Sequence, residues 1–226
     1  MECLQCFLEG HWQASGTLVH QLELLSVADS PHRKTVKHYH RVGDLHELTF
    51  SCYQQMPLLT NDSWRQLLSK LIDEALRQTA MQLVAFVYMP EHVHLIIDPL
   101  EAEPRLPEFL TKIKQPFSHE IKNLLEKSNS SLLKRLTVRE RPGKESFRFW
   151  QEGPGYDRNL QKPATILAAI DYLHLNPVRR GLVIRAIDWK WSSARWYLNG
   201  PPRQQDPDLP TIHGLRPGSL DINFAE

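Results

Sequence analysis

Apolar and polar residues alternate regularly only from about residue 47, and the pattern there predicts strands and helices in turn. Leu48, Phe50 and Cys52 are separated by polar neighbours, a period of two that is typical of a half-buried strand. The polar residues 61–63 can cap a helix, and from Trp64 to about Thr79 apolar residues recur at spacings of three and four. The folded part of the chain is therefore predicted to begin with a strand and an amphipathic helix.

The next two strands are predicted to form a hairpin. Residues 83–89 and 93–97 are rich in apolar side chains, and only a short connection separates them. The helix predicted after them contains Pro116, which should kink or divide it because proline cannot donate a backbone hydrogen bond.

Another strand and another helix complete the pattern. A strand is predicted at 147–150, a glycine-rich turn at 153–158, and a helix at 163–176 that Pro177 ends. This order predicts an α+β fold with a central, mostly antiparallel sheet sandwiched by helices.

Composition divides the chain into three parts. Residues 1–30 contain four acidic residues and no Lys or Arg, and the basic, histidine-rich stretch 31–41 follows. Such a break predicts a disordered leader at 1–35, a domain at 36–198 and an irregular, proline-rich tail at 199–226.

The bulk numbers indicate an ordinary soluble protein. The chain has 226 residues, a net charge of +1 and three cysteines, which is no disulfide framework and indicates a reducing compartment. We find neither a signal peptide nor an apolar run long enough to span a bilayer, so a cytoplasmic protein without a membrane partner is expected.

Charge is uneven along the chain. Between Arg105 and Arg148 there are eleven Lys and Arg residues and five Glu residues, a local balance of +6. This is either a solvated helix face or a nucleic-acid surface, and the near-neutral whole chain makes the second at least as favoured.

Two histidines begin the third predicted strand. His92 and His94 should emerge on one face, with Val93 on the other, and two imidazoles placed in this way can chelate one divalent metal ion. The alternative is a pair of ordinary half-buried histidines.

The helix at 163–176 presents a tyrosine away from its apolar face. Tyr172 lies roughly opposite Ile170, on a small and polar line that also contains Asn176 one turn further on. From the helix alone, the favoured interpretation is a surface tyrosine that packs against a neighbouring loop.

Two motifs together resemble a known family. Tyr88-Met-Pro-Glu-His-Val-His-Leu, followed about eighty residues later by Asp171-Tyr-Leu-His-Leu-Asn-Pro-Val-Arg-Arg-Gly, resembles the REP-associated tyrosine transposases, a branch of the HUH-type single-tyrosine transposases of small insertion sequences. The resemblance covers about residues 40–198 and implies a ferredoxin-like, HUH-type fold.

The resemblance implies a role for each residue of the two motifs. His92, His94 and Asn176 become metal ligands for Mg²⁺ or Mn²⁺, although two histidines would also accept zinc. Tyr172 becomes the nucleophile that forms a 5′-phosphotyrosine intermediate. Because this intermediate conserves bond energy, strand transfer and rejoining are expected rather than hydrolysis.

The implied substrate is single-stranded DNA with a hairpin formed by a palindromic repeat, bound by a monomer or a homodimer. Lys112, Lys114 and Lys122 could follow the phosphates, and Arg179 and Arg180 are candidates for phosphate contacts near the nucleophile. Three tryptophans could stack on bases or pack the C-terminal segment onto the domain; they are Trp189, Trp191 and Trp196.

Three alternatives stay open. Tyr156, in the glycine-rich turn, is an alternative nucleophile, although a helix fixes a phenol more rigidly than a turn. The protein could be a domesticated, non-catalytic hairpin-DNA-binding protein. It could also be a metal-dependent phosphodiesterase, which would require an Asp, Glu or His as third ligand.

Overall fold

The computed structural model of the chain describes residues 43–153, 155–200 and 203–220. The predicted leader at 1–35 and the histidine-rich stretch lie outside these residues. The elements in chain order are β1 (Leu45–Ser51), η1 (Tyr53–Gln55), α1 (Asp62–Gln78), β2 (Met81–Tyr88), β3 (His92–Pro99), α2 (Leu106–Lys127), α3 (Ser131–Leu136), β4 (Thr137–Arg141), β5 (Lys144–Phe147), β6 (Tyr156–Leu160), α4 (Pro163–Arg179), η2 (Ala186–Asp188) and α5 (Ala194–Leu198).

Four strands form one antiparallel sheet in the order β2-β3-β1-β6. With α1 between β1 and β2, and α2 between β3 and β6, this is the β-α-β-β-α-β arrangement of ferredoxin-like folds. The predicted α+β class and the predicted hairpin of β2 and β3 are confirmed.

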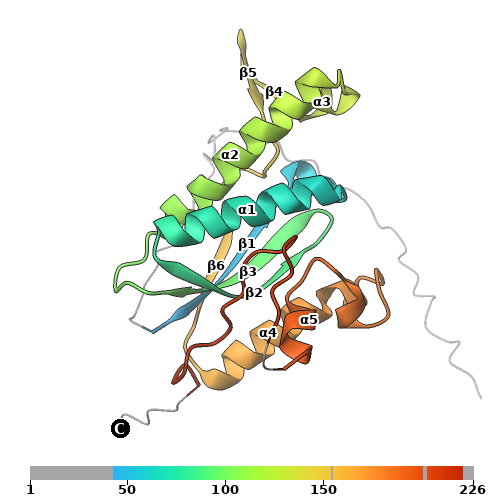
Figure 1. Cartoon of the computed structure of the whole chain (residues 1–226). Helices are drawn as coiled ribbons and strands as arrows, with labels where there is room; N and C mark the ends of the chain where they lie inside the picture. Colours follow the sequence, from blue (N-terminus) through green and yellow to red (C-terminus); the bar gives the residue numbers. More distant parts are fainter. Residues whose placement is uncertain (1–42, 154, 201–202, 221–226) are drawn as a thin grey trace, which may run out of the picture. The chain divides into compact units, whose positions relative to one another are not determined.

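Helices cover both faces of this sheet (Figure 1). Alternate strand residues such as Phe50 and Leu95 pack against α1 and α2 in the larger core. Residues on the other face, among them Val87 and Ile96, pack against α4 in a smaller core. The predicted sandwich of helices around a sheet is confirmed, and α4 lies on the face toward which His92 and His94 point.

The outer edge of β2 is covered by segments from late in the chain. Tyr88 N–H donates to the Trp191 carbonyl and His213 N–H donates to the Leu83 carbonyl, both over less than 3 Å. Trp191 and Trp196 are buried, which favours packing rather than base stacking for these two tryptophans. Coverage of this kind removes an exposed edge that could pair with other chains.

Neither of two prolines within helices interrupts its helix. Pro116 does not divide α2, because burial of Ile113 and Phe117 on either side holds the helix together. Pro177 does not end α4, which continues to Arg179. Gly181 lies just beyond the helix with a φ of +68°, and the Gly181 and Leu182 N–H groups donate back to helix carbonyls in a Schellman motif that ends the helix.

The region from 137 to 160 also differs from its prediction. The strand expected at 147–150 lies earlier, as β5, and pairs with β4 in a separate ribbon. The turn expected at 153–158 ends at Gly155, so Tyr156 lies on strand β6. A Cβ atom on Gly155 would lie 2.3 Å from the Thr49 carbonyl oxygen, so only glycine lets the chain enter the sheet here.

Candidate active site

The structure brings the two histidine side chains of β3 together. Their Nε2 atoms are 3.0 Å apart, and the planes of the rings lie at 87° to each other. Val93 between them points into the core on the opposite face, as the alternation of a strand requires. His92 and His94 therefore form one site on the α4 face of the sheet.

The outer nitrogen of each imidazole has its own partner. His92 Nδ1 lies 3.1 Å from the Glu91 carboxylate, and His94 Nδ1 lies 2.7 Å from Thr49 Oγ1. A carboxylate only accepts hydrogen bonds, so a neutral His92 carries its proton on Nδ1. The Asn176 amide donates to His94 Nε2 over 3.2 Å, which places the His94 proton on Nδ1 as well. Two imidazole lone pairs consequently face one small space.

Burial keeps the pair uncharged at neutral pH. His94 is 8% exposed, and burial followed by the nearby charge of His92 lowers the pKa of His94 to about 4. Burial also lowers the pKa of His92, although the Glu91 carboxylate opposes this. Neutral imidazoles are the form that binds metal ions, so neither ligand would have to lose a proton first.

Helix α4 carries the tyrosine to the histidine pair. Ile166, Ile170 and Leu173 pack against the sheet, and Tyr172 on another side of the helix is 48% exposed. Its ring centroid lies 6.4 Å from that of His94. The helix therefore presents a solvent-accessible tyrosine beside the His94 ring.

The two arginines at the end of α4 both lie at this site, in different roles. Arg180 donates to the Glu91 carboxylate over 2.7 Å and so ties the end of the helix to the turn before His92. The Arg179 guanidinium lies 4.6 Å from the centroid of the Tyr172 ring. The site thus has positive charge next to its phenol, where a phosphate would be attracted.

Tyr156 lies on the same face of the sheet but further from the histidines. It pairs with Thr49 across β6 and β1, and Thr49 pairs with His94 across β1 and β3. Two strand spacings, about 10 Å, therefore separate the backbones of Tyr156 and His94. Tyr156 is 54% exposed, so it is accessible but less close than Tyr172.

The three predicted DNA-binding lysines of α2 are not part of this site. The larger core places α2 on the opposite face of the sheet. Lys112 pairs with Glu108 and Lys122 pairs with Glu126, whereas the Lys114 ammonium donates to the Gly153 carbonyl over 3.4 Å. Burial lowers the pKa of Lys114.

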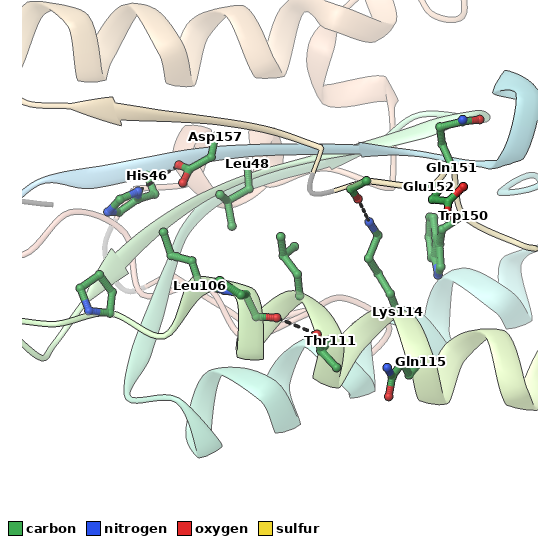
Figure 2. A pocket seen from close by; sticks show the side chains of 14 residues that line it. His46, Leu48, Leu106, Thr111, Lys114, Gln115, Trp150, Gln151, Glu152 and Asp157 are labelled. Atoms are coloured by element: carbon green, nitrogen blue, oxygen red, sulfur yellow. Dashed lines mark hydrogen bonds and ion pairs between the residues drawn. The ribbon is translucent and has the colours of Figure 1, made fainter. Parts of the chain in front are cut away.

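Lys114 extends into a cleft of about 650 Å³ beside α2 (Figure 2). Apolar side chains such as Leu48 and Leu106 line part of the cleft, together with polar side chains that include the His46–Asp157 pair. None of its lining residues belongs to the histidine pair or to α4.

Glu91 and Thr49 were not predicted as site residues. Glu91 directly precedes His92 in the sequence, so a contact between these two side chains could have been predicted from their adjacency. Thr49 is 45 residues from His94 in the sequence, and only the register of β1 with β3 brings the two together.

In the described part of the chain, no group of three or more His, Cys, Asp or Glu side chains is arranged to hold a metal ion. A metal bound by the histidine pair would therefore draw its remaining ligands from Asn176 and water.

Residues 45–160 match the family model described as IS200-like transposase. The chain belongs to the IS200-like transposase family. The transposase membership that the two motifs indicated is confirmed at the level of the IS200-like family, and the match includes His92 and His94 but ends before Tyr172. A transposase-type function follows at this level.

A solved structure shares the fold of this transposase. A REP-associated tyrosine transposase bound to a REP hairpin superimposes with a TM-score of 0.56 at 21% identity, covering 80% of this chain and 96% of that one. At that identity the likeness establishes the fold alone. A crystal structure of a protein from Deinococcus radiodurans R1 gives a TM-score of 0.36 at 18% identity over 61% of this chain and 96% of that one, too low to indicate a common fold.

No curated protein sequence matches the chain. Among its described residues, no helix is both long enough and apolar enough to cross a membrane.

Proposed function

We propose that this transposase cleaves and rejoins single-stranded DNA that carries a hairpin, with Tyr172 as its nucleophile. The observation that carries the proposal is the exposed Tyr172 side chain, whose ring lies 6.4 Å from the His94 ring of the histidine pair. The hairpin substrate is suggested by the REP hairpin bound to the structurally similar transposase.

The histidine pair fits Mg²⁺ or Mn²⁺. Two ligands at right angles, each roughly 2.1 Å from an octahedral ion, are about 3 Å apart, and the two Nε2 atoms are separated by 3.0 Å. Rotation of the Asn176 amide would bring its oxygen toward the same space. A bound divalent ion would polarise the scissile phosphate and neutralise charge that develops on it.

The chain's own residues carry out the rest of the reaction. The Tyr172 oxygen forms a bond to phosphorus while its proton passes to solvent. The bond from phosphorus to the 3′ oxygen breaks, and this oxygen leaves with the electron pair and takes up a proton. Arg179 and the helix hold the phenol in place, and the reverse attack by a 3′-hydroxyl rejoins the strand.

The geometry favours this reaction over simple phosphodiester hydrolysis. A metal hydrolase would require a third Asp, Glu or His ligand, and the described residues offer no such cluster. Simple hydrolysis would also give no role in the reaction to Tyr172 or to Arg179.

The test uses the full chain and a labelled single-stranded oligonucleotide that contains a hairpin with unpaired flanks. We expect a protein–DNA adduct that survives denaturing electrophoresis in Mn²⁺ and is absent when a chelator is present. An oligonucleotide of the same composition that forms no hairpin is the control. Tight hairpin binding with no adduct in Mg²⁺, Mn²⁺ or Zn²⁺ would establish the non-catalytic alternative.

Replacing Thr49 with Val should weaken Mn²⁺ binding roughly 10- to 100-fold, because His94 loses the hydroxyl that orients its ring. Calorimetric titration of Mn²⁺ in the absence of DNA measures this. The matched control is Thr111→Val on α2, where the hydroxyl donates to the Pro107 carbonyl on the other side of the sheet. Equal Mn²⁺ affinity in the two variants would show that Thr49 does not position a ligand.

A further inference from the structure

Strands β4 and β5 form a two-stranded ribbon that is separate from the main sheet. We call residues 137–147 the basic arm. Figure 1 shows it projecting beyond α2 and α3. Every residue from 139 to 145 is exposed, so the outer half of the arm packs against little of the domain.

The base of the arm is firmly attached to the domain. Leu136, directly before β4, is fully buried, and Phe147 at the end of β5 packs against the same core. The Arg148 N–H donates to the Leu136 carbonyl over 2.7 Å, and the Thr137 hydroxyl donates to the Leu133 carbonyl over 2.8 Å. The arm is therefore held at a fixed place while its outer half stays accessible.

Positive charge is concentrated around this arm. Residues 134–148 contain six Lys and Arg residues and two Glu residues, a balance of +4 in a chain whose net charge is +1. Lys144 and Arg148 both pair with Glu140. Arg139 and Arg141 form no ion pair within the part of the chain that the structure describes. Two guanidinium groups are therefore available to an anionic partner.

We propose that the basic arm binds the duplex stem of the DNA hairpin, with Arg139 and Arg141 contacting its phosphates. This inference rests on the proposed function, because it concerns the same substrate. A two-stranded ribbon fits the major groove of duplex nucleic acid, and guanidinium groups form charge-assisted hydrogen bonds with phosphate.

The position of the arm relative to the histidine pair supports this assignment. The chain leaving β5 reaches Trp150, which pairs with Cys52 next to the end of β1. The Cys52 N–H donates to the Glu91 carbonyl, and Glu91 precedes His92. The arm and the histidine pair thus lie near the same end of the sheet. A stem held by the arm would leave its unpaired flank to pass around this end toward Tyr172.

The test compares the unaltered chain, the double variant R139A/R141A, and the control K70A/R77A, which removes two exposed positive charges from α1. Fluorescence anisotropy with a hairpin oligonucleotide gives the affinity at several salt concentrations. We expect R139A/R141A to bind about tenfold more weakly and to lower the slope of log affinity against log salt by about 2. The control should match the unaltered chain.

A second oligonucleotide with the same unpaired flank and no stem distinguishes binding of the stem by the arm from binding of the flank at the active site. R139A/R141A should bind it as the unaltered chain does, and should form the adduct at the same rate when the hairpin is saturating. If the unaltered chain binds the hairpin and R139A/R141A shows the same affinity and salt slope, the arm has no such role and the proposed function still stands. If the unaltered chain does not bind the hairpin, both proposals fail.

Discussion

Replacing Tyr172 with Phe should abolish the covalent protein–DNA adduct, with a loss of at least about 10³-fold. The substitution removes only the hydroxyl oxygen, which is the atom that would bond to phosphorus. Tyr156→Phe should leave adduct formation nearly unchanged, because Tyr156 lies on β6, separated from the histidine strand by β1. Denaturing electrophoresis of the labelled adduct measures both effects in one assay.

Two controls show whether a loss of the adduct comes from the reaction itself or from a loss of folding or of hairpin binding. Tyr172 is 48% exposed, so Tyr172→Phe should keep the thermal midpoint of the unaltered chain. It should also keep its hairpin affinity, since the phenol oxygen is not needed to hold the stem. An adduct that persists in Tyr172→Phe and disappears in Tyr156→Phe would assign the nucleophile to Tyr156 and contradict our proposal.

The regular part of the fold could be predicted because its apolar pattern is strong. β1 and α1 show periods of two and about 3.6 in the sequence, because apolar residues gather on one face of each. β2 and β3 are visible as nearly continuous apolar runs, because both faces of the sheet are buried there. Where an element buries little, the pattern is weak. β6 buries only Leu160 and has exposed or half-exposed residues elsewhere, so the sequence pattern predicts a turn at its first residues.

The basic arm could have been found by its turn and not by its strands. Its strands contain mostly exposed, charged residues, so no alternation of apolar residues reveals them. Pro142-Gly143, however, is a turn signal, and Gly143 has a φ of +77° that favours glycine. Tertiary packing can override a proline or glycine signal of this kind. At Pro116, the burial of one face of α2 outweighs the backbone hydrogen bond that proline cannot form.

The residues of the candidate site could be predicted better than the way in which the fold brings them together. The spacing of His92 and His94 alone places them on one face of a strand. The docking of α4 against that face depends on the smaller core, which no local pattern specifies, and only the resemblance connected Tyr172 with the histidines. The contacts of Thr49 and Glu91 with the outer nitrogens depend on strand register and on a turn. These contacts decide which nitrogen atom of each imidazole is left to bind a metal ion.

The C-terminal segment should be necessary for stability although residues 203–220 contain no helix or strand. Asp98 is fully buried at the end of β3, and both oxygens of its carboxylate accept hydrogen bonds from the Arg216 guanidinium. Arg216→Ala would leave this carboxylate buried without a compensating charge. Removing one partner of a buried pair costs about 3–5 kcal/mol, and because Arg216 is 41% exposed we expect a loss of about 2–3 kcal/mol.

Urea unfolding of the full chain measures this loss of unfolding free energy. Arg77→Ala, which removes an arginine from an exposed pair with Glu74, should cost less than about 0.5 kcal/mol. The double variant D98N/R216A should be more stable than Arg216→Ala, because a neutral amide is less costly to bury alone than a carboxylate. If it is no more stable, the loss would come from the packing of the Arg216 side chain and not from the buried charge. The three measurements together show how much of the loss of unfolding free energy comes from the uncompensated buried charge and how much from the lost packing of the Arg216 side chain.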